Sequence, residues 1–224
     1  MKILKNKNYK KAGNGLWMPS IGRSENNSVG GIFLPVCGLV SSNITPNCTL
    51  PNINGVDVSI LIANWSHVSA ITQNATTKAV ETITMTSTNK FFTWEGKKTS
   101  YNAKESMIKG KLQSTFSHEV SGVFFGVTPL EKLQLQALTN GAVMVIVKYK
   151  YKGTTANCKY ALHGYDQGLE LAVLERDQSK GESVGAYDFT LKTPEGYPES
   201  LLPIGIWVTS EAATDAVIAG VTAP

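Results

Sequence analysis

The chain has 224 residues, of which 42% are hydrophobic and only 17% are charged, and its formal net charge is +4. So low a charged fraction argues against a disordered charged tail and against a long helical bundle. No apolar run reaches the roughly 20 residues that span a bilayer, and no apolar segment follows the basic N-terminus as in a secretory signal. We therefore expect a soluble, folded, mainly β protein.

Residues 1–55 are predicted to form an extended N-terminal arm. Glycine and proline interrupt this segment too often for long helices or strands, yet it carries the apolar runs Leu16-Trp17-Met18 and Ile32-Phe33-Leu34. Such an arm would lay apolar side chains on its own domain or on a neighbouring subunit, since long loops within compact domains are uncommon and usually functional.

Five lysines lie within the first 11 residues, so the rest of the chain is close to neutral. This distribution argues against a strongly basic nucleic-acid surface. We interpret the basic end as a solvated terminus, with contact to phosphate as the alternative. The cysteines Cys37, Cys48 and Cys158 are odd in number and lack the close spacing of a metal site, so we interpret them as free thiols.

Strand patterns become dense from about residue 56, and residues 56–224 are predicted to form one β-domain. Runs of β-branched and aromatic residues, and stretches of alternating polarity, predict its strands. These fall at residues 58–62, 80–86, 91–94, 112–120, 142–152, 158–162, 168–174, 185–191 and 204–209. The tail, 214–224, is small and apolar and is expected to form either a short helix or a terminal strand.

One helix is predicted at residues 128–140. Thr128, Pro129 and Glu131 supply an N-cap, a proline at the first helical position and the acidic partner of a capping box. The apolar residues of the segment form one stripe at helical spacing, which must either lie on a sheet or be exposed. The stripe consists of Leu130, Leu133, Ala137 and Leu138.

The segment after this helix is apolar at 142–147, as in a strand buried on both faces, and then alternates lysine with tyrosine at 148–152. This change predicts a strand whose far end projects beyond its sheet. Because alternation separates the lysines from the tyrosines, a groove that combines charge with base stacking is not favoured. We expect the tyrosine face to pack, and the lysine face to meet water or acidic groups.

Together these elements predict an antiparallel β-sandwich or partly open barrel of about eight strands, with one packed α-helix and a long extended N-terminal arm.

Residues that could support catalysis are few. His67, His118 and His163 are isolated in the sequence, and we expect them to be hydrogen-bonded or solvent-facing. His163 and Asp166 are three residues apart, but no nucleophile, zinc-binding or phosphate-binding motif accompanies them. We therefore expect no catalytic, cofactor-binding or metal-binding residues, no cofactor and no enzymatic activity. A small hydrolase that uses His163 and Asp166 is the disfavoured alternative.

The order of elements resembles that of the tail-tube and tail-ring proteins of bacteriophages, including the short-tailed gut phages of the crAss-like kind. The resemblance covers roughly residues 56–210: a β region, the capped helix, a long strand, a strand-turn-strand at 159–174 and the final strand at 185–191. In that family a β-sandwich or barrel flanked by one helix assembles side by side into rings, and an extended segment or long hairpin reaches the adjacent subunit or ring.

The resemblance implies a structural virion protein that self-assembles into a ring or tube of a phage tail or neck, as part of the genome-delivery channel. It implies as partners other copies of the chain, other tail or neck proteins and genome DNA that passes without sequence-specific binding, with no membrane. Its location would be the virion tail, after synthesis in the host cytoplasm. Because lumens in this family are usually acidic or neutral, the basic N-terminal arm is expected to lie away from the channel; otherwise the assembly is not a conduit for DNA.

A carbohydrate-binding or adhesin-like β-sandwich is the alternative function. Its sugar platform would come from the four tryptophans, although core packing is the commoner fate of tryptophan. These are Trp17, Trp65, Trp94 and Trp207.

Overall fold

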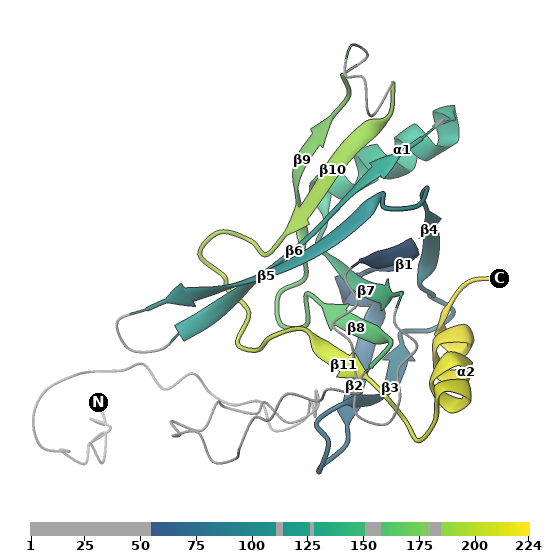
Figure 1. The fold of residues 1–224 in the computed structure, drawn as a ribbon, viewed down its shortest axis with the longest axis vertical. Helices are drawn as coiled ribbons and strands as arrows, with labels where there is room; N and C mark the ends of the chain where they lie inside the picture. The colour runs from purple at the N-terminus through teal and green to yellow at the C-terminus, as the bar shows by residue number, and fades with distance from the viewer. Residues whose placement is uncertain (1–54, 111–113, 126–127, 151–157, 178, 180–184) are drawn as a thin grey trace, which may run out of the picture.

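The computed structural model (Figure 1) describes residues 55–110, 114–125, 128–150, 158–177, 179 and 185–224. Nearly all of the predicted N-terminal arm, with Cys37, Cys48 and Trp17, lies outside these residues. The described part of the chain is built from two β-sheets and two α-helices.

The larger sheet has seven strands in the order β2-β3-β11-β8-β7-β1-β4. Their bounds are β1 Val56–Asn64, β2 Val68–Gln73, β3 Val80–Met85, β4 Phe92–Glu95, β7 Val143–Tyr149, β8 Tyr160–His163 and β11 Ile204–Ile206. The short 3-10 helix η1, Trp65–His67, joins β1 to β2.

The smaller sheet has four strands in the order β5-β6-β10-β9. Their bounds are β5 Tyr101–Lys109, β6 Ser114–Phe124, β9 Glu170–Glu175 and β10 Tyr187–Lys192. In Figure 1 this sheet lies across the larger one, and the far ends of β5 and β6 extend to the left, away from it. Within the described residues the two sheets do not close into a barrel, so the predicted sandwich class is confirmed.

All nine predicted strands are present, but β2 and β5 were not predicted. The larger sheet is also not wholly antiparallel, because β11 pairs with β3 in the parallel direction through Ile206 and Val80. The tail, for which a helix and a strand were both open, forms the helix α2, Glu211–Val221. The described residues therefore form two α-helices rather than the one expected.

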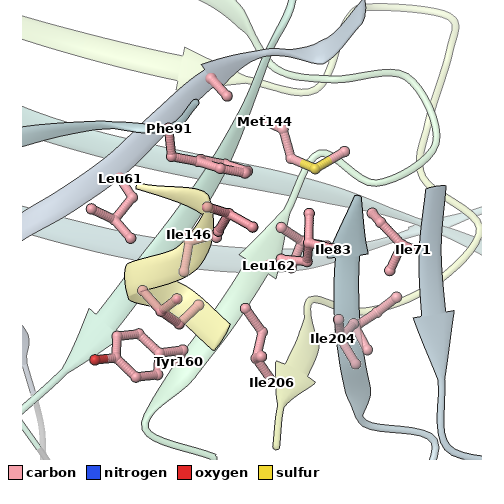
Figure 2. Packing of buried hydrophobic residues seen from close by; sticks show 14 residues of the cluster. Leu61, Ile71, Ile83, Phe91, Met144, Ile146, Tyr160, Leu162, Ile204 and Ile206 are labelled. Atoms are coloured by element: carbon pink, nitrogen blue, oxygen red, sulfur yellow. The ribbon is translucent and has the colours of Figure 1, made fainter. Parts of the chain in front are cut away.

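The first hydrophobic core lies between the larger sheet and α2 (Figure 2). Phe91 is fully buried, and its backbone is bonded to the end of α2: its N–H donates to the Val221 carbonyl, and its carbonyl accepts from the N–H of Ala223. The start of α2 is tied to β8, since Lys159 Nζ lies 3.0 Å from carboxylate oxygens of both Glu211 and Asp215. These bonds hold the C-terminal helix over one face of the sheet.

The second core lies between the two sheets. Strand β7 is buried from Val143 to Val147 and serves both cores. Met144 and Ile146 face the first cluster, and Val143, Val145 and Val147 face the second. This arrangement confirms the prediction of a strand covered on both sides. It follows because α2 covers one face of the larger sheet while the smaller sheet covers the other.

Aromatic rings fill one end of the second core. Phe189 stacks on Phe124 with ring centroids 4.9 Å apart, and Trp94 and Tyr101 meet both rings edge-on. Gly122 lies beneath this group, where a Cβ atom would come within 2.4 Å of the Tyr101 ring. A glycine is therefore required for the rings to approach the backbone this closely.

The predicted helix is present as α1, Pro129–Ala137, followed by the 3-10 turn η2, Leu138–Asn140. Its capping box is confirmed, since Thr128 and Glu131 each accept a hydrogen bond from the other's backbone N–H. Of the two outcomes left open for the apolar stripe, exposure holds for Leu130 and Leu133, which are 68% and 60% exposed. Leu138 of the stripe is buried, together with Leu135, which the stripe did not include. The cap determines where the helix begins, whereas the sheets beneath it decide which face is buried.

Candidate functional site

The structure brings His118 and His163 together, although they are far apart in the sequence. Both side chains are buried, and their rings meet edge-on with centroids 5.5 Å apart. His118 Nδ1 accepts from the Gly164 N–H at 3.3 Å, so Nε2–H donates to the Leu201 carbonyl at 2.9 Å. Burial lowers the pKa of His118. This histidine is therefore a neutral, hydrogen-bonded core residue, as expected from the sequence.

His163 is fully buried, and among the described residues neither ring nitrogen has a hydrogen-bond partner. Burial, together with the neighbouring His118, lowers its pKa to about 3. The neutral imidazole is therefore the form that this core accommodates.

Asp166 and Glu199 join two loops beside the histidines. Both Glu199 carboxylate oxygens accept backbone N–H groups, from Asp166 at 2.8 Å and from Gln167 at 3.3 Å. In return, Asp166 accepts from the backbone N–H and the hydroxyl of Ser200. Burial, together with the charge of Asp166, raises the pKa of Glu199 to about 7 although these backbone donors lower it. Glu199 was not predicted from the sequence.

This cluster does not form a catalytic relay. Within the described residues no hydrogen bond joins His163 to Asp166, and the Ser200 hydroxyl donates to Asp166 rather than to a histidine. Both ring nitrogens of His118 are engaged by backbone groups. The groups are placed to stabilise the loops, which does not favour the hydrolase alternative.

No set of three His, Cys, Asp or Glu side chains in the described ranges is placed to hold a metal ion. Among the same residues, no helix has both the length and the apolar character needed to cross a membrane. Cys158 is a free, half-buried thiol in this part of the chain, and burial raises its pKa.

The described tryptophans lie in different environments. Trp65 is 40% exposed and lines a cleft of about 510 Å³ together with Tyr165 and Gln167. Trp207 is buried, and Trp94 packs in the aromatic group of the second core. The described residues therefore provide a single exposed tryptophan rather than a platform of several.

The prediction that the lysine–tyrosine segment overruns its sheet is wrong as far as Lys150. Tyr149 pairs with Val56 on one side and donates its N–H to the Lys159 carbonyl on the other, and the Lys150 N–H donates to Gly55. The Lys148 ammonium lies 2.8 Å from Asp57, and this bond lowers the pKa of that carboxyl. Residues 151–152 lie outside the described residues.

The hairpin of β5 and β6 overruns its sheet instead. From Asn102 to Lys109 nearly every residue of β5 is exposed, and Met107 and Ile108 are 62% and 45% exposed. β5 is also an edge strand of nine residues that pairs with β6 without a register shift. A long, regular edge strand is the kind that pairs readily with another chain.

The four sheet edges differ in how well they are protected. In the larger sheet, β4 has only four residues, and the pairing of β2 contains two register shifts. Short strands and bulges of this kind discourage further pairing. In the smaller sheet, no strand of the described residues pairs with the outer side of β5 or of β9. These two edges are the candidate functional site.

The face of the smaller sheet that points away from the core is mostly polar, although Ile108, Val123 and Val173 also lie on it. Alternation places small polar side chains along it, between charged residues. They are Asn102, Ser106, Ser117, Ser121 and Thr190.

Comparison of the chain with protein-family models, with curated proteins and with solved structures gives no match.

Proposed function

We propose that this chain is a structural virion protein that self-assembles into a ring or tube of a phage tail or neck, forming part of the genome-delivery channel. The observation that carries this role is a four-stranded sheet open at both edges, one of them the projecting strand β5. Among the described residues of a single copy, no strand pairs with the outer side of either edge, and further copies of the same chain can supply the missing partners.

Strand direction supports assembly from head to tail. The pairs β5–β6, β6–β10 and β10–β9 are all antiparallel, so β5 and β9 run in opposite directions. When β9 of one copy lies beside β5 of the next, another antiparallel pair forms and the sheet continues without a break. Such an interface joins two different surfaces, and it closes into a ring when the rotation between copies permits.

The exposed face and the hairpin fit the other parts of this role. A face of serine, threonine, asparagine and mixed charges remains wet, and it suits the wall of a channel through which DNA passes without base contacts. The apolar side chains of Met107 and Ile108, at the far end of the hairpin, suit contact with the next ring or with another tail protein.

Sedimentation velocity and electron microscopy of the purified full-length chain at micromolar concentration test this role. We expect ring-shaped homo-oligomers, alone or stacked. A particle that remains strictly monomeric over this concentration range would contradict the proposal.

A charge at the end of the hairpin should separate rings without opening them. We expect Met107→Asp to abolish stacked rings or tubes in micrographs, because a desolvated carboxylate would face the neighbouring ring. Leu202→Asp is the matched control, since Leu202 is 50% exposed but lies outside the hairpin. Equal stacking in both variants would remove the hairpin from the assembly contact.

The carbohydrate-binding alternative depends on the cleft beside Trp65, where Asp166 and Gln167 supply polar groups. If it is correct, the chain binds immobilised glycans as a monomer, and Trp65→Ala abolishes that binding while Trp94→Phe preserves it. A ring-forming chain that retains no glycan would leave this alternative without support.

A further inference from the structure

We infer that β9 of one copy pairs with β5 of the next, and that the attraction between Lys104 and the acidic edge of β9 selects this head-to-tail contact over a two-fold dimer. The inference rests on the proposed ring role and names the contact that would close the ring.

A row of alternating charge crosses the smaller sheet. Lys104 lies opposite Glu119, Glu119 lies opposite Lys192, and Lys192 lies opposite Glu170. All four line an open cleft of about 810 Å³ on the face away from the core, bordered by the loop at 193–198. Opposite charges on directly facing strand positions are favourable, whereas like charges are unfavourable. The row therefore has a positive end at β5 and a negative end at β9.

The two edges differ in charge along this face. On β5 the residues of this face are Asn102, Lys104, Ser106 and Ile108, so the lysine carries the one charge. On β9 the charged residues of the same face are Glu170 and Glu175. Glu175 lies on this face because it pairs with Asp188, which is four residues from Lys192 on β10.

Two-fold pairing of equal edges is disfavoured by this distribution. A β5–β5 contact would bring two copies of Lys104 to this face with no carboxylate of β5 beside them, because Glu105 and Lys109 lie on the opposite face. A β9–β9 contact would gather four glutamates. On the face that carries the charge row, only the β9–β5 contact places opposite charges across the interface.

Two registers of the β9–β5 contact bring Lys104 to a glutamate, whereas a shift of two residues would place Val173 opposite it. If the row continues straight into the next copy, Glu170 faces Lys104, and Leu171 lies beside Ala103 on the core side. If closure tilts the strands, the register shifts by an even number of residues, because an odd shift would turn apolar residues to the wet face. A shift of four residues places Glu175 opposite Lys104, where the four are counted along β10 because β9 has one extra residue at its bulge.

Charge reversal and its compensation test the contact in the full-length chain. We expect Lys104→Glu to lower the ring fraction at least tenfold by sedimentation velocity at fixed protein concentration. We expect the same loss for Glu170→Lys in the straight register or for Glu175→Lys in the shifted one. Combining Lys104→Glu with the matching glutamate reversal should restore rings and so identify the register. Lys132→Glu, on the exposed side of α1, is the matched control and should assemble normally.

The outcomes separate this contact from the ring role itself. Rings formed equally well by Lys104→Glu and by the wild type, with far-ultraviolet circular dichroism unchanged, would overturn the contact and leave the ring role standing. Failure of both double variants to restore rings would also overturn the contact. So would a wild-type chain that forms closed dimers, if Lys104→Glu made those dimers more stable. A monomeric wild-type chain would instead contradict the ring role.

Discussion

Replacing Phe189 by alanine should lower the free energy of unfolding by about 3–5 kcal/mol, the range observed when a large buried aromatic residue is truncated. The side chain is 1% exposed, and its ring stacks on Phe124 and meets Trp94 and Tyr101 edge-on. Truncation therefore leaves a cavity between the two sheets and removes three ring contacts. Denaturant titration of variant and wild type in the same oligomeric state measures the difference.

Phe92 provides a control of the same residue type. Its side chain is 56% exposed on the edge strand β4, so Phe92→Ala should change the free energy of unfolding by no more than about 0.5 kcal/mol. Similar losses for the two variants would mean that Phe189 is not a central packing residue of the second core.

Replacing His163 by leucine should stabilise the protein increasingly, relative to the wild type, as the pH falls from 8 to 5. The pKa of His163 is about 3 in the folded chain, against 6.5 for an unperturbed histidine. The folded state therefore takes up no proton over this range, while the unfolded chain does so below 6.5. Protonation of His163 in the unfolded chain therefore does not affect the free energy of unfolding of the wild type above pH 6.5. Below pH 6.5 it lowers that free energy progressively, by about 2 kcal/mol at pH 5.

The comparison must be made between variant and wild type, because neighbouring groups titrate in the same range. Glu199, with a raised pKa of about 7, acts in the opposite direction: its contribution is present at low pH and is lost as the pH rises through 7. His118, whose pKa is lowered, acts in the same direction as His163. Denaturant titrations at pH 8, 6.5 and 5 isolate the effect of His163. A difference between variant and wild type that stays constant with pH would contradict it.

Local patterns in the sequence were enough for the fold class and for most elements. Strands that face the core on one side or both, such as β7 and β3, carry apolar or β-branched runs because burial demands them. The start of α1 was predictable because a capping box satisfies backbone groups within four residues of one another.

The candidate site was not predictable in this way. β5 was missed because only Tyr101 is buried and Ala103 half-buried, while the rest of the strand projects past the core and needs no hydrophobic periodicity. Its signal is pairing with β6, which becomes visible only when both strands are placed. The buried cluster around His163 was likewise missed, since Glu199 and Leu201 reach it from a loop distant in the sequence.

The sequence by itself determined that the chain is mainly β, where nine of its strands lie, and how its first helix begins, because these depend on short-range burial and capping. Only the tertiary structure decided which strands lie at the sheet edges, which hairpin projects, and that Lys104 and Glu170 end one row of alternating charge. Strand order brings together residues that are distant along the chain, and no local periodicity encodes which edge remains open.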